Sequence, residues 1–114
     1  MEADFVGING GKVEEFEIVM KKKSKTLWKE RHFKFGEKSI KYFKSKSDMS
    51  KEKALGTIDY SDVIMVEPME DSGTKFKVFA TEREHYMNAT SPEDRKKVLE
   101  FLGKKNPSWM VFED

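Results

Sequence analysis

The chain contains no cysteine among its 114 residues. This absence excludes a disulfide framework and any metal site built on thiolates. Long apolar runs are also missing, because no segment approaches the roughly 20 residues that a membrane-spanning helix requires. The first residues lack the charged-then-apolar pattern of a secretory signal. We therefore expect a cytosolic protein.

The sequence also lacks the side-chain groupings that catalysis and metal binding need. Its two histidines, His32 and His85, show no ligand spacing with other metal-binding residues, so we expect no metal site. A nucleophile, a base and an orienting group cannot be assembled from the remaining residues. We therefore expect a binding module with no catalytic residues and no cofactor.

What the chain does have is aromatic material and an uneven charge distribution. Nine phenylalanines, two tryptophans and three tyrosines supply bulky core residues for what the length predicts to be one domain. The net charge is only +1, yet residues 20–56 hold 13 lysines and arginines against four acids. This excess predicts a face that attracts anions. The alternative is an ordinary lysine-rich solvated surface.

The densest cations come directly before a predicted strand, within residues 21–35 (KKKSKTLWKERHFKF). Side chains alternate between the two faces of a strand. Lys29, Arg31, Phe33 and Phe35 are therefore expected to share one face, with two cations followed by two aromatics. Such a face suits the open end of a small barrel, where the aromatics fill the interior and the cations line the rim. An anionic ligand is predicted to bind at that rim.

The rest of the chain reads as short strands followed by one helix. Alternation and turn residues predict seven strands, over residues 15–22, 27–35, 39–44, 56–60, 63–68, 74–80 and 84–90. For the first strand, Phe16, Ile18 and Met20 compete with Val19 for the interior, so periodicity leaves its inward face open. Ser91 followed by Pro92 predicts a helix start, and the segment 103–105 (GKK) predicts its end. This order predicts a bent antiparallel sheet closed by a helix.

Together these features resemble the pleckstrin homology (PH) family, across about residues 15–104. The resemblance rests on the order and spacing of five pieces, which are IVMK at 18–21, WKERHF at 28–33, IKYF at 40–43, GTI at 56–58 and YMNATSPE at 86–93. Two positions depart from the family pattern. Val98 stands where the helix usually carries a tryptophan, and Leu55 stands where tight phosphoinositide binders often have a basic residue.

The resemblance implies a mainly β fold, in which a seven-stranded antiparallel bent sheet, or partly open barrel, is capped by one C-terminal α-helix. We expect the PH-like domain to cover residues 13–105. Residues 1–12 are predicted to be a flexible lead-in, and residues 106–114 a tail or linker that packs back on the domain or leads into a further segment. The chain is expected to be monomeric. It fits the N-terminal part of a larger signalling protein such as a kinase.

The resemblance also implies a function and a site. It implies a non-catalytic membrane-targeting module that holds a phosphoinositide headgroup between the first and third strand-connecting loops. The residues implied to contact the headgroup are Lys21, Lys29, Arg31 and Tyr42. Further lysines are expected to help through general attraction to an anionic membrane, namely Lys22, Lys23, Lys25, Lys51 and Lys53. We expect recruitment to the inner face of the plasma membrane or to another anionic membrane.

A protein-interaction module on the same scaffold, with weak and non-selective attraction to lipid, is the alternative. The departure at Leu55 favours it. Nucleic-acid binding would also use the lysines, but Trp28, Tyr42 and Phe43 do not form an evident stacking row. We therefore expect no nucleic-acid partner.

Overall fold

A computed structural model describes residues 15–110 of the chain. The predicted lead-in, residues 1–12, lies outside this range. Seven strands form one antiparallel sheet in the order β4-β3-β2-β1-β7-β6-β5. The strands are β1 (Phe16–Ser24), β2 (Leu27–Phe35), β3 (Ser39–Phe43), β4 (Gly56–Asp59), β5 (Val63–Pro68), β6 (Lys75–Ala80) and β7 (Glu84–Asn88). The predicted seven-stranded sheet is thus confirmed.

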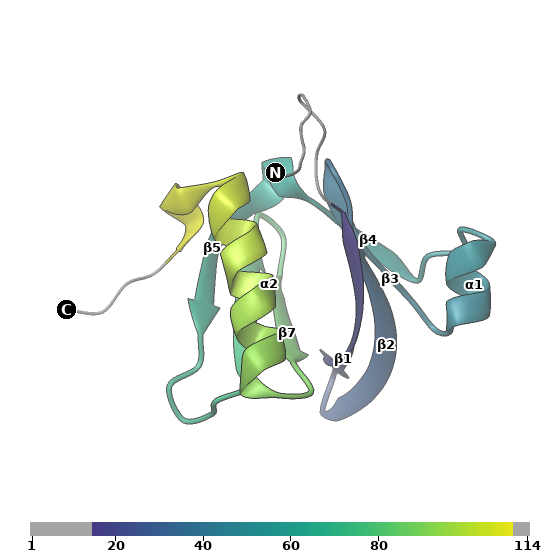
Figure 1. Ribbon diagram of the computed structural model, residues 1–114, viewed down its shortest axis with the longest axis horizontal. Coiled ribbons are helices and arrows are strands. Elements are labelled where there is room, and N and C mark those ends of the chain that lie inside the picture. The colour runs from purple at the N-terminus through teal and green to yellow at the C-terminus, as the bar shows by residue number, and fades with distance from the viewer. Residues whose placement is uncertain (1–14, 111–114) are drawn as a thin grey trace, which may run out of the picture.

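The sheet is bent, and one helix covers its open side. Strands β1 to β4 lie on one side of the molecule in Figure 1, and β5 to β7 lie on the other with α2 (Pro92–Lys105) packed across them. The two halves meet where β1 pairs with β7 over only two residue pairs, Lys21 with Asn88 and Lys22 with Met87. This short junction allows the two halves to diverge around a shared core.

The first helical turn of α2 forms as its sequence predicts. The Ser91 side chain accepts a hydrogen bond from the Asp94 backbone N–H at 3.1 Å, and Pro92 is the first helical residue. Such a cap satisfies a backbone donor that would otherwise lack a partner. The helix buries Val98, Phe101 and Leu102. The predicted C-terminal helix is therefore confirmed.

Aromatic rings fill the contact between the helix and the sheet. Phe16 stacks on Phe35 with ring centroids 4.8 Å apart, and Phe101 of α2 meets Phe16 edge-on at 4.9 Å. Val98 is fully buried beside them. The helix therefore closes the core with Val98 at the position where the family usually has a tryptophan.

Three short elements were not predicted from the sequence. Helix α1 (Lys46–Ser50) lies in the connection from β3 to β4, and the 3-10 turn η1 (Tyr60–Asp62) follows β4. A second 3-10 turn, η2 (Pro107–Trp109), follows α2. There Trp109 is buried, and its ring lies 5.8 Å from that of Tyr60. Residues 106–110 therefore pack back on the domain.

Candidate functional site

The register of the first hairpin decides which cations reach the interior. Strands β1 and β2 pair so that Met20 lies opposite Arg31, and Lys22 lies opposite Lys29. Directly opposed residues in an antiparallel pair point to the same face. Met20 is buried in the core, so Lys22, Lys29 and Arg31 share the face that turns inward. Phe33 and Phe35 on the same face are fully buried.

Lys21 lies on the other face of this hairpin. It is exposed and sits opposite Glu30, whereas Lys22 is only 5% exposed. The sequence prediction that Lys21 converges with Arg31 is therefore wrong in its geometry. Periodicity had left the inward face of β1 open, and a shift of one residue moves every side chain to the opposite face. The strand cation that reaches the cavity is Lys22.

Lys22 is held under an aromatic ring at the open end of the barrel. Its Nζ lies 4.9 Å from the ring centroid of Tyr42, a favourable cation–π contact. Burial, together with the positive charges of Arg83 and Arg31, lowers the pKa of Lys22 from 10.5 to about 8. Within residues 15–110, no carboxylate forms an ion pair with any of these three cations. The site is thus a partly desolvated group of positive charges.

These cations line one cavity, which we call the cationic pocket. Its volume is about 230 Å³, and its walls come from β1, β2, β3, the segment before β4, and the β6–β7 turn. The residues that line it are Lys22, Lys23, Ser24, Arg31, Tyr42, Leu55 and Arg83. Arginine and lysine donors around such a space suit a phosphate group.

Arg83 was missed by the sequence reasoning. It comes from the tight turn between β6 and β7, which is closed by hydrogen bonds in both directions between Ala80 and Arg83. No local pattern in the sequence links this turn to the first hairpin. Only the pairing of β7 with β1 brings the two together.

Gly56 keeps the Tyr42 ring in place over Lys22. The two residues are opposed across β3 and β4. A Cβ at position 56 would overlap the hydroxyl and ring atoms of Tyr42. Glycine is therefore the residue that allows the ring to lie flat against the β4 backbone.

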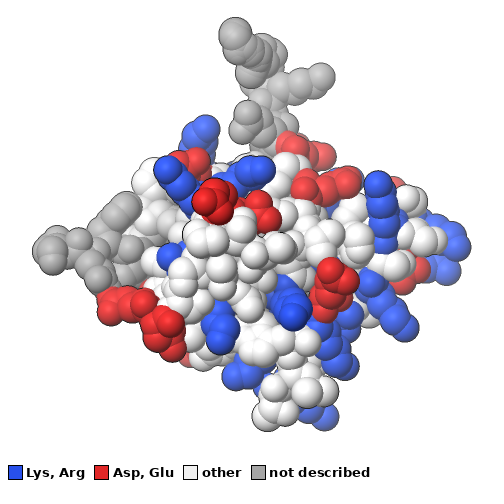
Figure 2. Space-filling view, turned by 60° about the horizontal axis from the view of Figure 1, so that its bottom comes forward, with Lys and Arg blue, Asp and Glu red and all other residues white. Residues whose placement is uncertain are grey.

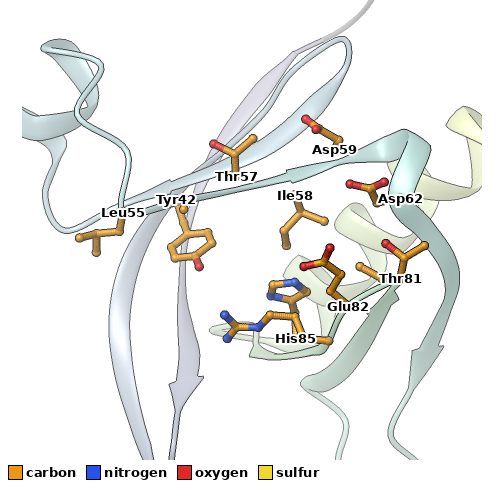
Figure 3. A pocket seen from close by; sticks show the side chains of 12 residues that line it. Tyr42, Leu55, Thr57, Ile58, Asp59, Asp62, Thr81, Glu82 and His85 are labelled. Atoms are coloured by element: carbon orange, nitrogen blue, oxygen red, sulfur yellow. The ribbon is translucent and has the colours of Figure 1, made fainter.

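A second cavity, the side pocket, adjoins the cationic pocket. It has a volume of about 340 Å³ and shares Tyr42, Leu55 and Arg83 with its neighbour. Figure 3 shows it between β4 and the β6–β7 turn, with the Tyr42 ring and the His85 imidazole at one end. The remaining lining residues are Gly56, Thr57, Ile58, Asp59, Asp62, Ala80, Thr81 and Glu82.

His85 is a buried polar residue of the side pocket. It is 6% exposed, and its Nδ1 has no hydrogen bond among the described residues. Burial, together with the positive charges of Lys22 and Arg83, lowers the pKa of His85 from 6.5 to about 4. The imidazole is therefore neutral near pH 7.

The other predicted site residues lie around the cationic pocket rather than in it. Lys29 is exposed on the inward face of the hairpin. Lys25 is in the two-residue turn between β1 and β2, with a positive φ of 58°. Lys51 and Lys53 are exposed after α1. Figure 2 shows blue side chains gathered over the lower and right parts of the molecule, the side where α1 lies, and red ones mainly at the top and lower left.

Trp28 packs on the outer face of the sheet. It lies opposite Lys23 on β1, and the Nζ atoms of Lys23 and Lys75 lie 6.0 and 5.3 Å from its ring centroid. The Nζ of Lys23 also lies 5.5 Å from the ring of Tyr86. Trp28 therefore joins three strands, a structural role.

Two further features of the described residues bear on the class of site. Of the helices formed within residues 15–110, none is long and apolar enough to cross a membrane. In the same part of the chain, no three histidine, aspartate or glutamate side chains gather in a way that would hold a metal ion.

The bent sheet and its capping helix together define a small β module, with the cationic pocket at its open end. The model of the PH domain family matches residues 12–101. The chain belongs to the PH domain family, whose members are typically non-catalytic modules. Comparison with curated protein sequences gives no significant match.

Solved structures show the same fold. The PH domain of human oxysterol-binding protein-related protein 11 is 17% identical, with a TM-score of 0.70 over 95% of this chain and 94% of that one. The PH domain of human TBC1 domain family member 2 is 20% identical, with a TM-score of 0.69 over 87% of each chain. The likeness at these identities concerns the fold alone.

Proposed function

We propose that this PH domain is a phosphoinositide-binding, membrane-targeting module. A headgroup phosphate enters the cationic pocket between the β1–β2 hairpin and the β3–β4 connection, where it meets Lys22, Arg31 and the Tyr42 hydroxyl. Recruitment is to the inner face of the plasma membrane or to another anionic membrane.

The observation that carries this proposal is the group of positive charges in the cationic pocket, with which no carboxylate of residues 15–110 forms an ion pair. Lys22 is 5% exposed and lies close enough to Arg31 and Arg83 for their charges to lower its pKa. Like charges in a partly desolvated site repel one another, and a bound anion removes that repulsion. The Nη1 of Arg31 donates a hydrogen bond to the Glu30 carbonyl at 2.9 Å, which leaves its other donors for a ligand.

The surrounding lysines add general attraction to an anionic surface. Each lysine near such a surface contributes about 1 kcal/mol, and the effect fades within a Debye length. Three or four acting together supply about half of the roughly 8 kcal/mol of a micromolar complex. This group comprises Lys21, Lys23, Lys25, Lys29, Lys51 and Lys53.

Arg31→Ala tests the proposal directly. Loss of a charge-assisted contact to phosphate is expected to weaken binding to phosphoinositide vesicles at least about tenfold. Lys41→Ala is the matched control, because Lys41 is exposed on β3 and does not line the cationic pocket. It removes the same charge and should weaken binding far less. Equal retention of wild type and Arg31→Ala on the vesicles would refute the headgroup role.

A protein-interaction module is the second candidate, and the exposure of Leu55 favours it. This side chain is 53% exposed at the edge of the cationic pocket. A module that recognises an acidic peptide should bind vesicles of equal charge to the same extent, whatever the lipid. A preference for phosphoinositides over phosphatidylserine at matched charge would therefore count against this candidate.

A further inference from the structure

The cationic pocket is small for a ligand site. Its volume of about 230 Å³ lies below the range of roughly 300–1,000 Å³ that is usual for small-molecule sites. The side pocket, at about 340 Å³, opens from it across Tyr42, Leu55 and Arg83. The side pocket is therefore the adjoining space into which a ligand can extend when its phosphate fills the first pocket.

The two pockets differ in charge. The cationic pocket is lined by the charged groups of Lys22, Arg31 and Arg83, and no acid lines it. The side pocket contains three carboxylates and, besides the shared Arg83, no lysine or arginine. In Figure 3, Asp62 and Glu82 lie across the pocket from Tyr42, and Asp59 lies further along the chain from Thr57. The combined site is thus positive at one end and negative at the other.

Hydrogen-bonding groups that suit hydroxyls also line the side pocket. The lining of the side pocket includes Thr57, Thr81 and His85. The His85 side chain is only 6% exposed, and its Nδ1 lacks a hydrogen-bond partner among the described residues. Its lowered pKa keeps the imidazole neutral near pH 7. A buried polar group of this kind favours a ligand that supplies a hydrogen bond. Neutral imidazole and threonine hydroxyls can each pair with a ligand hydroxyl.

We propose that the side pocket selects against headgroups that carry several phosphates. It accepts the hydroxyl-bearing part of the inositol ring, and its carboxylates at positions 59, 62 and 82 repel any further phosphate placed there. Repulsion of a wrong ligand is a recognised source of specificity. This inference rests on the proposed function, because it concerns the part of the same ligand that lies beyond the first phosphate.

A triple variant tests the selection. Asp59→Asn, Asp62→Asn and Glu82→Gln together remove the negative end, and all three side chains are exposed, so the fold should tolerate the changes. The matched control is Glu70→Gln, Asp71→Asn and Glu100→Gln. These residues are also exposed and line neither of the two pockets. Both triple variants remove three negative charges. Any general gain in attraction to phosphates is therefore the same in both and cancels when the two variants are compared.

The measurement compares binding to two sets of phosphatidylcholine vesicles. The first set carries a phosphoinositide with a single ring phosphate, and the second carries a phosphoinositide with three ring phosphates. The amounts of the two lipids are chosen so that both sets of vesicles have the same total headgroup charge. Wild type and control should prefer the singly phosphorylated lipid. In the site variant, that preference should fall by at least about threefold, as expected for the loss of several exposed charges. An unchanged preference would overturn the selection while leaving the proposed function intact.

Failure of the proposed function has a different signature. In that case wild type binds neither vesicle above its binding to phosphatidylcholine alone.

A second readout separates the effect of the membrane surface from the effect of the headgroup itself. Soluble inositol phosphates with one and three ring phosphates, measured by calorimetry, should show the same change in preference. A change seen on vesicles but absent with the soluble compounds would contradict the proposal, since it would assign the effect to the membrane surface.

Discussion

At the scale of single residues, the site depends on a lysine that the protein buries against its natural tendency. Lysine is rarely buried without a partner of opposite charge. Here Lys22 is covered by Tyr42 and lies near Arg31 and Arg83, and its pKa falls to about 8. Its position costs stability while the site is empty. The same cost favours the binding of an anion.

The lowered pKa predicts a pH dependence with a definite sign. Free Lys22 loses its proton near pH 8, whereas a bound phosphate holds it in the charged form. Affinity for the headgroup should therefore be full below pH 8 and fall as pH rises above it, by up to about tenfold per pH unit for one proton. The phosphate does not contribute, because its second pKa is near 6. Calorimetry between pH 7 and pH 9 measures this fall.

Stability should respond in the opposite direction. Above pH 8 the folded lysine becomes neutral, while the unfolded one stays charged up to about pH 10.5, so stability contributed by Lys22 rises within that window. Lys22→Met lacks the titrating group and should show neither effect. If affinity in Lys22→Met fell with pH as steeply as in wild type, Lys22 would not be the titrating residue.

Gly56 is a second residue-scale test. In Gly56→Ala the new methyl group displaces the Tyr42 ring, and we expect a loss of about 1–3 kcal/mol in unfolding free energy together with weaker headgroup binding. Denaturant unfolding measures the first effect. In a Tyr42→Ala background the same substitution should cost much less, because nothing remains to clash. An equal cost in both backgrounds would rule out the clash with Tyr42.

At the scale of elements, local signals predicted some features well and others not at all. The cap at Ser91 was predictable because the cap, Pro92 and the acids of the first turn are neighbours in sequence. Helix α1 was missed because its five residues have no apolar periodicity and bury no side chain. Lys21 was chosen over Lys22 because the face of β1 is set by its partner strands, not by its own pattern.

Helix α1 ends in a backbone conformation that suits glycine. Glu52 has a φ of 58°, and the bonds from Glu52 N–H to Met49 and from Lys53 N–H to Asp48 are those of a Schellman motif. Glu52→Gly should raise the unfolding free energy by about 1 kcal/mol, because glycine adopts this conformation without strain. Denaturant unfolding checks the change. Glu52→Ala keeps the Cβ, and a gain in Ala equal to that in Gly would refute the strain.

At the scale of the whole molecule, the fold was predictable from the sequence, whereas the residues that line the site were only partly predictable. The order of seven strands and a helix follows from motifs that are local in sequence. The site gathers residues from β1, β2, β3 and the β6–β7 turn, so Arg83 and His85 become neighbours of Lys22 only through the pairing of β7 with β1. Strand alternation predicted the inward face of Arg31, the family resemblance names both Arg31 and Tyr42, and both line the cationic pocket.

The most direct test of the account is a map of backbone amide chemical shifts as a soluble inositol phosphate is added to the whole chain. The largest changes should fall on Lys22, Arg31, Tyr42 and Arg83, with smaller ones at His85 and Thr81. Changes confined to the outer face around Trp28 and Tyr86, or no change at saturating ligand, would contradict it.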